Sequence, residues 1–153
     1  MPEPDQAGSP SPADAVYADW EQRVESWEEF QDVVLELTHR HASREMVWRG
    51  ARRAEWGLMS SLYRTLLELR QGEPPQEDDL IHAEDRTLYL ARKDWRFDDR
   101  PALELLAHLQ HYGAPTRLLD VSMNPLIALW FAVEERKRDE GADGRVFLSL
   151  IHI

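Results

Sequence analysis

Residues 109–120 read Leu-Gln-His-Tyr-Gly-Ala-Pro-Thr-Arg-Leu-Leu-Asp, and residues 124–133 read Asn-Pro-Leu-Ile-Ala-Leu-Trp-Phe-Ala-Val. Asn124 is a favoured N-cap residue and Pro125 fits the first helical position, so a helix is predicted to begin there. The run that follows Pro125 is apolar on every face of that helix, which predicts that the helix is buried at the centre of the domain. The polar residues just before it would then lie against a core.

The rest of the chain predicts several helices packed on a small sheet. Apolar residues at spacings of three and four, after a capping box formed by Ser26 and Glu29, indicate a helix over residues 27–39. Further helices are predicted over residues 61–70, from Asp78 or Asp79 to about residue 97, and between Pro101 and Gly113, with strands over residues 46–50 and from residue 145. This set of elements indicates an α+β fold.

The composition excludes several classes of protein. The 153 residues include no cysteine, which excludes disulfides, thiolate nucleophiles and cysteine-ligated metals and fits the reducing cytoplasm. The longest apolar run, residues 126–133, is much shorter than the roughly 20 residues that span a bilayer, so no membrane partner is expected. The net charge of −11 opposes nucleic acid as a default partner. The arginines between residues 44 and 64 are interpreted as a solvated surface, with a local basic groove as the alternative.

Both ends of the chain differ from its middle. Residues 1–14 hold four of the nine prolines and few side chains to bury, which predicts a disordered tail before a domain over residues 15–148. At the other end, residues 148–153 match the translation of a transposon-end adapter used for sequencing libraries, which predicts a non-native tail over residues 149–153. The same residues also read as a β-strand, and both interpretations stay open.

Three blocks of the chain resemble the FRG domain family. They are Trp48-Arg49-Gly50, then Trp56-x-Leu58 with Ser61-Leu62-Tyr63-Arg64, and the block 109–120 with the capped helix after it. The resemblance covers about residues 22–148, with departures at Trp48, Ala51, Ser60 and Val121. It implies a soluble intracellular α+β module without a defined biochemical role. It also implies that the domain and its sheet are incomplete, because the family continues past this point.

Seven polar residues are the candidate site residues: Arg49, Gln110, His111, Thr116, Arg117, Asp120 and Ser122. In one interpretation they form a structural network, in which Asp120 pairs with Arg117 or Arg49 and His111 caps a carbonyl. In the other they line a pocket for a small anionic ligand. The start of the helix at Asn124 and the guanidinium of Arg49 would then bind a pyrophosphate.

The layout is also similar to the Arg–Ser–Glu class of ADP-ribosyltransferases, in which a strand ending in aromatic-Arg-Gly holds NAD. This similarity implies NAD as a ligand, with Arg49 and the segment from Thr116 to Ser122 in the first two roles and the catalytic glutamate missing from this chain. Glu134 and Glu135 are interpreted as a solvated helix end. Whether the chain is an enzyme stays open, and the alternative function is a non-catalytic protein-interaction or regulatory domain with a protein partner.

No motif supports a different chemistry. The histidines at positions 39, 41, 82, 108 and 111 lack the spacing of metal ligands, so no metal site is expected. The sequence contains no P-loop, no G-x-G-x-x-G and no G-x-S-x-G turn.

Overall fold

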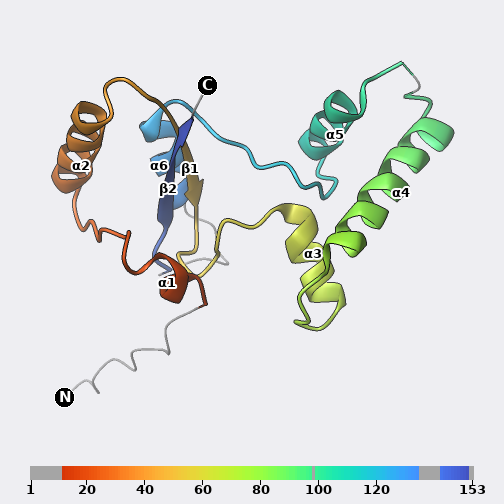
Figure 1. Ribbon diagram of the computed structural model, residues 1–153, viewed down its shortest axis with the longest axis horizontal. Helices are drawn as coiled ribbons and strands as arrows, with labels where there is room; N and C mark the ends of the chain where they lie inside the picture. Colours follow the sequence, from red (N-terminus) through yellow and green to blue (C-terminus); the bar gives the residue numbers. More distant parts are fainter. Residues whose placement is uncertain (1–11, 98, 135–141, 152–153) are drawn as a thin grey trace. The chain divides into compact units, whose positions relative to one another are not determined.

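The computed structural model describes residues 12–97, 99–134 and 142–151, and confirms the predicted α+β class (Figure 1). The elements in chain order are α1 (Pro12–Tyr17), α2 (Trp27–Arg40), β1 (Glu45–Ala51), α3 (Ser61–Leu69), α4 (Glu77–Trp95), α5 (Ala102–His111), α6 (Pro125–Val133) and β2 (Arg145–Ile151). Within the described residues, every helix is too short or too polar to cross a membrane. The region expected to form one domain comprises two compact units, Met1–Gly57 with Val121–Ile153, and Leu58–Asp120.

The expected terminal segments are described only in part. Residues 1–11 of the predicted tail lie outside the described residues, whereas the backbone of Pro12 to Asp14 begins α1. Ser149 to Ile151 form the end of β2, opposite Val47 to Glu45, as the strand interpretation requires. That residues 149–153 are non-native stays a prediction. The expected polar continuation of α6, residues 135–141, also lies outside the described residues.

In the first unit, β1 lies between β2 and the segment that leads into α6. β1 and β2 pair antiparallel, with Arg49 opposite Phe147. On the other edge of β1, Trp48 exchanges two backbone hydrogen bonds with Ser122, at 2.7 and 2.8 Å. Backbone groups point alternately to the two sides of a strand, so β1 can bond to both neighbours. Trp48 is only 5% exposed. Through its two hydrogen bonds with Ser122, its backbone positions the chain just before α6.

The glycine of β1 is required by the close approach of α6, which lies behind the strands in Figure 1. A Cβ added to Gly50 would collide with the backbone carbonyl oxygen of Ala128. Ala128 and Ala132 form the buried side of α6. Small side chains on both elements therefore let the helix backbone touch the strand backbone, which no larger residue at position 50 would permit.

The prediction that α6 is buried on every side is wrong within the described residues. Only Ala128 and Ala132 of this helix are buried. Five large side chains are between 46% and 65% exposed: Leu126, Ile127, Trp130, Phe131 and Val133. The physical reason is that α6 contacts the sheet through Ala128 and Ala132. In the described parts of the chain, no second layer of structure covers its larger apolar side chains.

In the second unit, α4 packs against both α3 and α5. Its core contains Ala91, Leu105 and Leu109, with Leu88, Phe97 and Ala114 packed against them. The predicted caps are largely confirmed. α4 begins slightly earlier than expected, because Gln76 is the N-cap and its backbone N–H donates to Asp79 Oδ2 at 2.8 Å. Gly113, with φ at 88°, follows α5 as expected.

We expect Gly50→Ala to destabilise the protein by roughly 1–3 kcal/mol, because the new methyl group forces α6 away from β1. Thermal denaturation followed by circular dichroism measures this as a lower midpoint. Glu45→Ala, at the exposed start of the same strand, is the control and should leave the midpoint almost unchanged. A Gly50→Ala variant that melts with the parent would show that α6 does not rest on β1.

Candidate functional site

Thr116 is fully buried, at 0% exposed, and its backbone is bonded to the start of α3. The Thr116 N–H donates to Ser61 Oγ at 3.0 Å. The Thr116 carbonyl accepts from Ser61 Oγ at 3.2 Å and from the Leu62 N–H at 3.1 Å. These three bonds hold the turn after α5 in one place, because buried backbone groups are costly to leave without partners.

The hydroxyl of Thr116 sets the orientation of Gln110. Thr116 Oγ1 accepts from the Leu118 N–H at 3.2 Å and donates its own proton to Gln110 Oε1. Gln110 Nε2 then donates to Asp120 Oδ1 at 2.7 Å. An ionised carboxylate only accepts hydrogen bonds, so the nitrogen of the amide must face Asp120 and its oxygen must face Thr116. The relay from Leu118 to Asp120 therefore has a single polarity.

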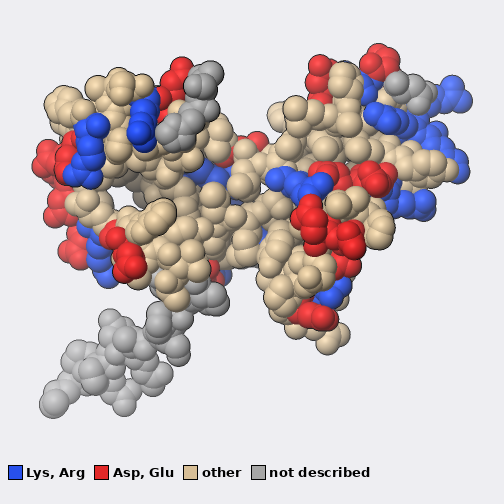
Figure 2. Space-filling model, viewed as in Figure 1, with Lys and Arg blue, Asp and Glu red and all other residues tan. Residues whose placement is uncertain are grey.

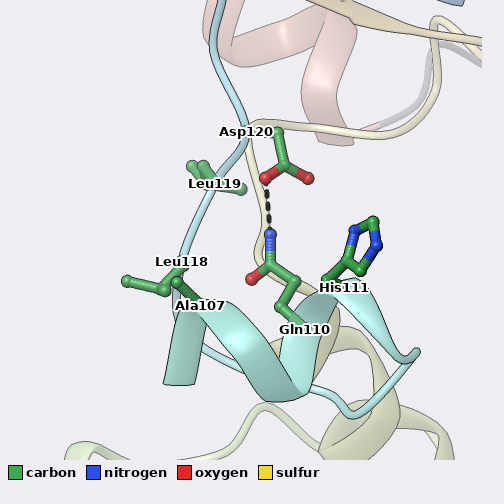
Figure 3. Close-up of a pocket in the computed structure, with 6 residues that line it drawn as sticks. All are labelled: Ala107, Gln110, His111, Leu118, Leu119 and Asp120. Carbon is green, nitrogen blue, oxygen red and sulfur yellow. Dashed lines mark hydrogen bonds between the residues drawn. The ribbon is translucent and has the colours of Figure 1, made fainter. Parts of the chain in front are cut away.

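Gln110, His111 and Asp120 line an open surface pocket of about 480 Å³, together with Ala107, Leu118 and Leu119 (Figure 3). His111 and Asp120 lie on one side of Gln110, and the two leucines lie on the other. The volume falls within the usual range of small-molecule pockets, which combine an apolar wall with a few fixed polar groups. The carboxylate of Asp120 accepts hydrogen bonds, so the pocket suits a ligand group that donates them.

Arg117 points away from this relay, toward α4. Its Nε donates to Glu84 Oε2 at 2.9 Å, and one terminal nitrogen lies 2.5 Å from Glu77 Oε1. The hydrogen bonds that the Arg117 guanidinium donates to Glu84 and, to a smaller extent, to Glu77 raise its pKa. The predicted pairing of Arg117 with Asp120 is therefore wrong. Glu77 and Glu84 are seven residues apart and share one face of α4, an arrangement in which one guanidinium can bind both.

Ser122 and Arg49 belong to the first unit. The backbone N–H groups at the start of α6, which were expected to bind an anion there, already have hydrogen-bond acceptors. The N–H of Asn124 donates to Ser122 Oγ at 3.0 Å, and the N–H of Leu126 donates to Asn124 Oδ1 at 2.9 Å. Pro125 has no N–H to offer. A pyrophosphate at the start of α6 would have to displace these bonds, so this helix end does not support the predicted clamp. The alternative pairing of Arg49 with Asp120 would join the two units and stays a prediction.

The structure thus brings four of the seven candidate residues together: Gln110, His111, Thr116 and Asp120. The side chain of His111 has no hydrogen bond to any described residue, and its ring lies edge-on to Tyr112 with centroids 5.5 Å apart. Its predicted role as a carbonyl cap is therefore wrong within that part of the chain. Sequence reasoning missed Ser61, although Ser61 lies in one of the blocks that carried the resemblance. In the described segments, no group of three or more His, Asp or Glu residues could hold a metal ion.

Residues 44–141, more than half of the chain, match the family model described as FRG domain. No curated protein and no solved structure matches the chain.

Thr116→Val keeps the shape of the side chain and removes its hydroxyl. We expect a loss of roughly 1–3 kcal/mol, because Gln110 Oε1 and the Leu118 N–H lose their partner in a buried site. Chemical denaturation measures the change. Thr38→Val is the matched control, since the Thr38 hydroxyl bonds to Val34 O on an exposed helix face. Equal midpoints for both variants would contradict the relay.

A double-mutant cycle distinguishes the observed partner of Arg117, Glu84, from the partner predicted from the sequence, Asp120. Arg117→Ala and Glu84→Ala should be coupled by about 1 kcal/mol, because Glu84 is only 14% exposed and loses its cation. Arg117→Ala and Asp120→Ala should add within about 0.5 kcal/mol, because Arg117 shares no partner with Asp120. Coupling found only in the second pair would reinstate the sequence interpretation.

Proposed function

The chain belongs to the FRG domain family, and we propose that it is a binding module for a nucleoside-containing ligand, NAD among them. The proposed site is the pocket lined by Gln110, His111 and Asp120. The observation that supports it is the fixed polarity of the relay, which presents a carboxylate and a histidine beside an apolar wall. Groups held in place before binding lose little entropy when a ligand arrives.

The chemistry of the pocket fits the nucleoside part of such a ligand. Asp120 Oδ1 already accepts from Gln110, and a carboxylate has further acceptor capacity for the hydroxyls of a ribose. The leucine side of the pocket, Leu118 and Leu119, suits the flat apolar surface of a base. NAD also carries a cationic nicotinamide ring, which a carboxylate attracts, and its anionic pyrophosphate would have to point away from Asp120.

The proposal concerns binding and no chemical step. In the similarity to ADP-ribosyltransferases, Arg49 and Ser122 contact the ligand and a later glutamate acts in catalysis. Ser122 Oγ already accepts from Asn124, and Glu134 lies 3.5 Å from Arg52 at the end of α6. We therefore assign the pocket to recognition of the nucleoside, and we assign no residue to catalysis.

One observation favours a second function, a non-catalytic protein-interaction domain. The exposed apolar side chains of α6, among them Trp130 and Phe131, form a surface of the kind that partner proteins cover. This function needs neither Asp120 nor the pocket. The two functions are therefore separated by whether the pocket residues affect the binding of a small molecule.

Isothermal titration calorimetry with NAD tests the proposal. We expect Asp120→Asn to weaken binding about 10-fold or more, because a hydrogen bond to a charged group is worth roughly 1.5–3 kcal/mol. Asparagine at this position still accepts from Gln110, so the relay is kept. Asp85→Asn, at an exposed position of α4, removes the same charge and should bind like the parent. Absence of heat with NAD, adenosine and nicotinamide riboside would end the proposal and leave the interaction domain.

A further inference from the structure

The second half of α4 and its C-cap residue carry four exposed cations. Arg86, Arg92, Lys93 and Arg96 are all exposed, and none of them forms an ion pair with an acidic residue in the described parts of the chain. Other arginines do form such pairs, as Arg40 does with Glu36. The chain has 29 acidic and 18 basic residues, so a shortage of carboxylates does not account for the difference.

These cations follow one face of the helix around an aromatic ring. Arg86, Tyr89 and Lys93 are spaced by three and four residues, and therefore line up along about 10 Å of helix. Arg96 follows as the C-cap, where φ is 58° and the helical path ends. The charged groups of Arg86 and Lys93 lie 5.6 and 5.4 Å from the centroid of the Tyr89 ring. Figure 2 shows Lys and Arg side chains gathered over this end of α4.

Helix electrostatics account for only part of this arrangement. Cations in the last turn are favoured by the helix dipole, which explains Arg92 and Lys93. The effect fades beyond that turn and does not explain Arg86. It also does not explain the exposed ring of Tyr89, which is 51% exposed.

We propose that single-stranded nucleic acid binds to the α4 basic face, defined as Arg86, Tyr89, Arg92, Lys93 and, just past the helix end, Arg96. Proteins that bind single strands combine a row of cations, which follows the phosphates, with exposed rings, on which the bases stack. The α4 basic face offers both on one rigid element. It shares no residue with the Gln110 to Asp120 pocket, so the inference does not depend on the proposed function.

Other anionic partners fit the same surface less well. A lipid surface requires a free apolar helix side, and the apolar side of α4 is packed in the core through Leu88 and Ala91. An acidic peptide would use the cations but leaves the exposed ring of Tyr89 without a role. The single strand is the partner that uses every group of the α4 basic face.

The net charge of −11 sets the conditions of binding. It repels a polyanion at long range, so we expect binding at low ionic strength and weak binding in physiological salt. Four cations on phosphates would give a slope of about −3 for the logarithm of affinity against the logarithm of salt concentration. From its net charge, we still expect the chain as a whole not to bind nucleic acid by default. We revise this expectation for the α4 basic face.

Fluorescence anisotropy with a labelled oligo-uridine strand at low ionic strength tests the inference. Arg86→Gln with Lys93→Gln should weaken binding about 10-fold or more, because two phosphate contacts are lost. Arg23→Gln with Arg40→Gln is the control, since it removes the same charge from exposed positions elsewhere and should bind within about twofold of the parent. Tyr89→Leu should weaken binding about 5-fold or more through lost stacking. Circular dichroism establishes that each variant is folded.

Three results would overturn the inference. One is no change in anisotropy with the parent at low ionic strength, and another is equal loss in the control and α4 variants, which indicates a general charge effect. The third result combines two measurements. Oligo-uridine still binds the Tyr89→Leu variant, and polyglutamate or vesicles with anionic lipid bind the parent as well as oligo-uridine does. That result would assign the α4 basic face to anions in general or to an acidic protein.

Discussion

The hydrogen bond from the buried hydroxyl of Thr116 to the amide of Gln110 is the interaction on which the candidate site depends. It determines which end of the amide faces Asp120, and so converts a flexible surface carboxylate into a positioned acceptor. The hydroxyl is itself fixed by the Leu118 N–H, and the Thr116 backbone is fixed by Ser61. A pocket built in this way keeps its polarity without a ligand, which is the property expected of a binding site.

Two residues of the aromatic-Arg-Gly segment of β1, Trp48 and Gly50, have a structural role. Trp48 bonds through its backbone to Ser122, and Gly50 lets the backbone of α6 approach. Two of its three residues are therefore explained by packing alone. The side chains of Ser122 and Asn124 accept hydrogen bonds from backbone N–H groups at the start of α6. What the first unit supplies is a rigid strand and helix, and the assignment of a ligand to Arg49 stays a prediction.

The sequence predicted what local signals determine. Caps and helix-ending residues such as Asn124 and Gly113 located the elements closely, because their effect acts within a few residues. The membership of Gln110 and Asp120 in one network was also predictable from polar groups beside apolar helices. The partner of Arg117 was not, since Glu77 and Glu84 come from a helix distant in sequence and several nearby carboxylates were equally suitable. The burial of α6 was overestimated, because an apolar sequence shows that burial of a helix is favourable and does not show whether another element packs over it.

The side-chain amide of Gln110 reports the state of the relay directly. Proton exchange of the glutamine NH₂ groups, followed by nuclear magnetic resonance in the full chain, compares it with Gln31 and Gln71, whose side chains are exposed. The account predicts that the Gln110 protons exchange more slowly than those of the other two, and that Thr116→Val removes this protection. Exchange of Gln110 as fast as that of Gln31 and Gln71 in the parent would contradict the account.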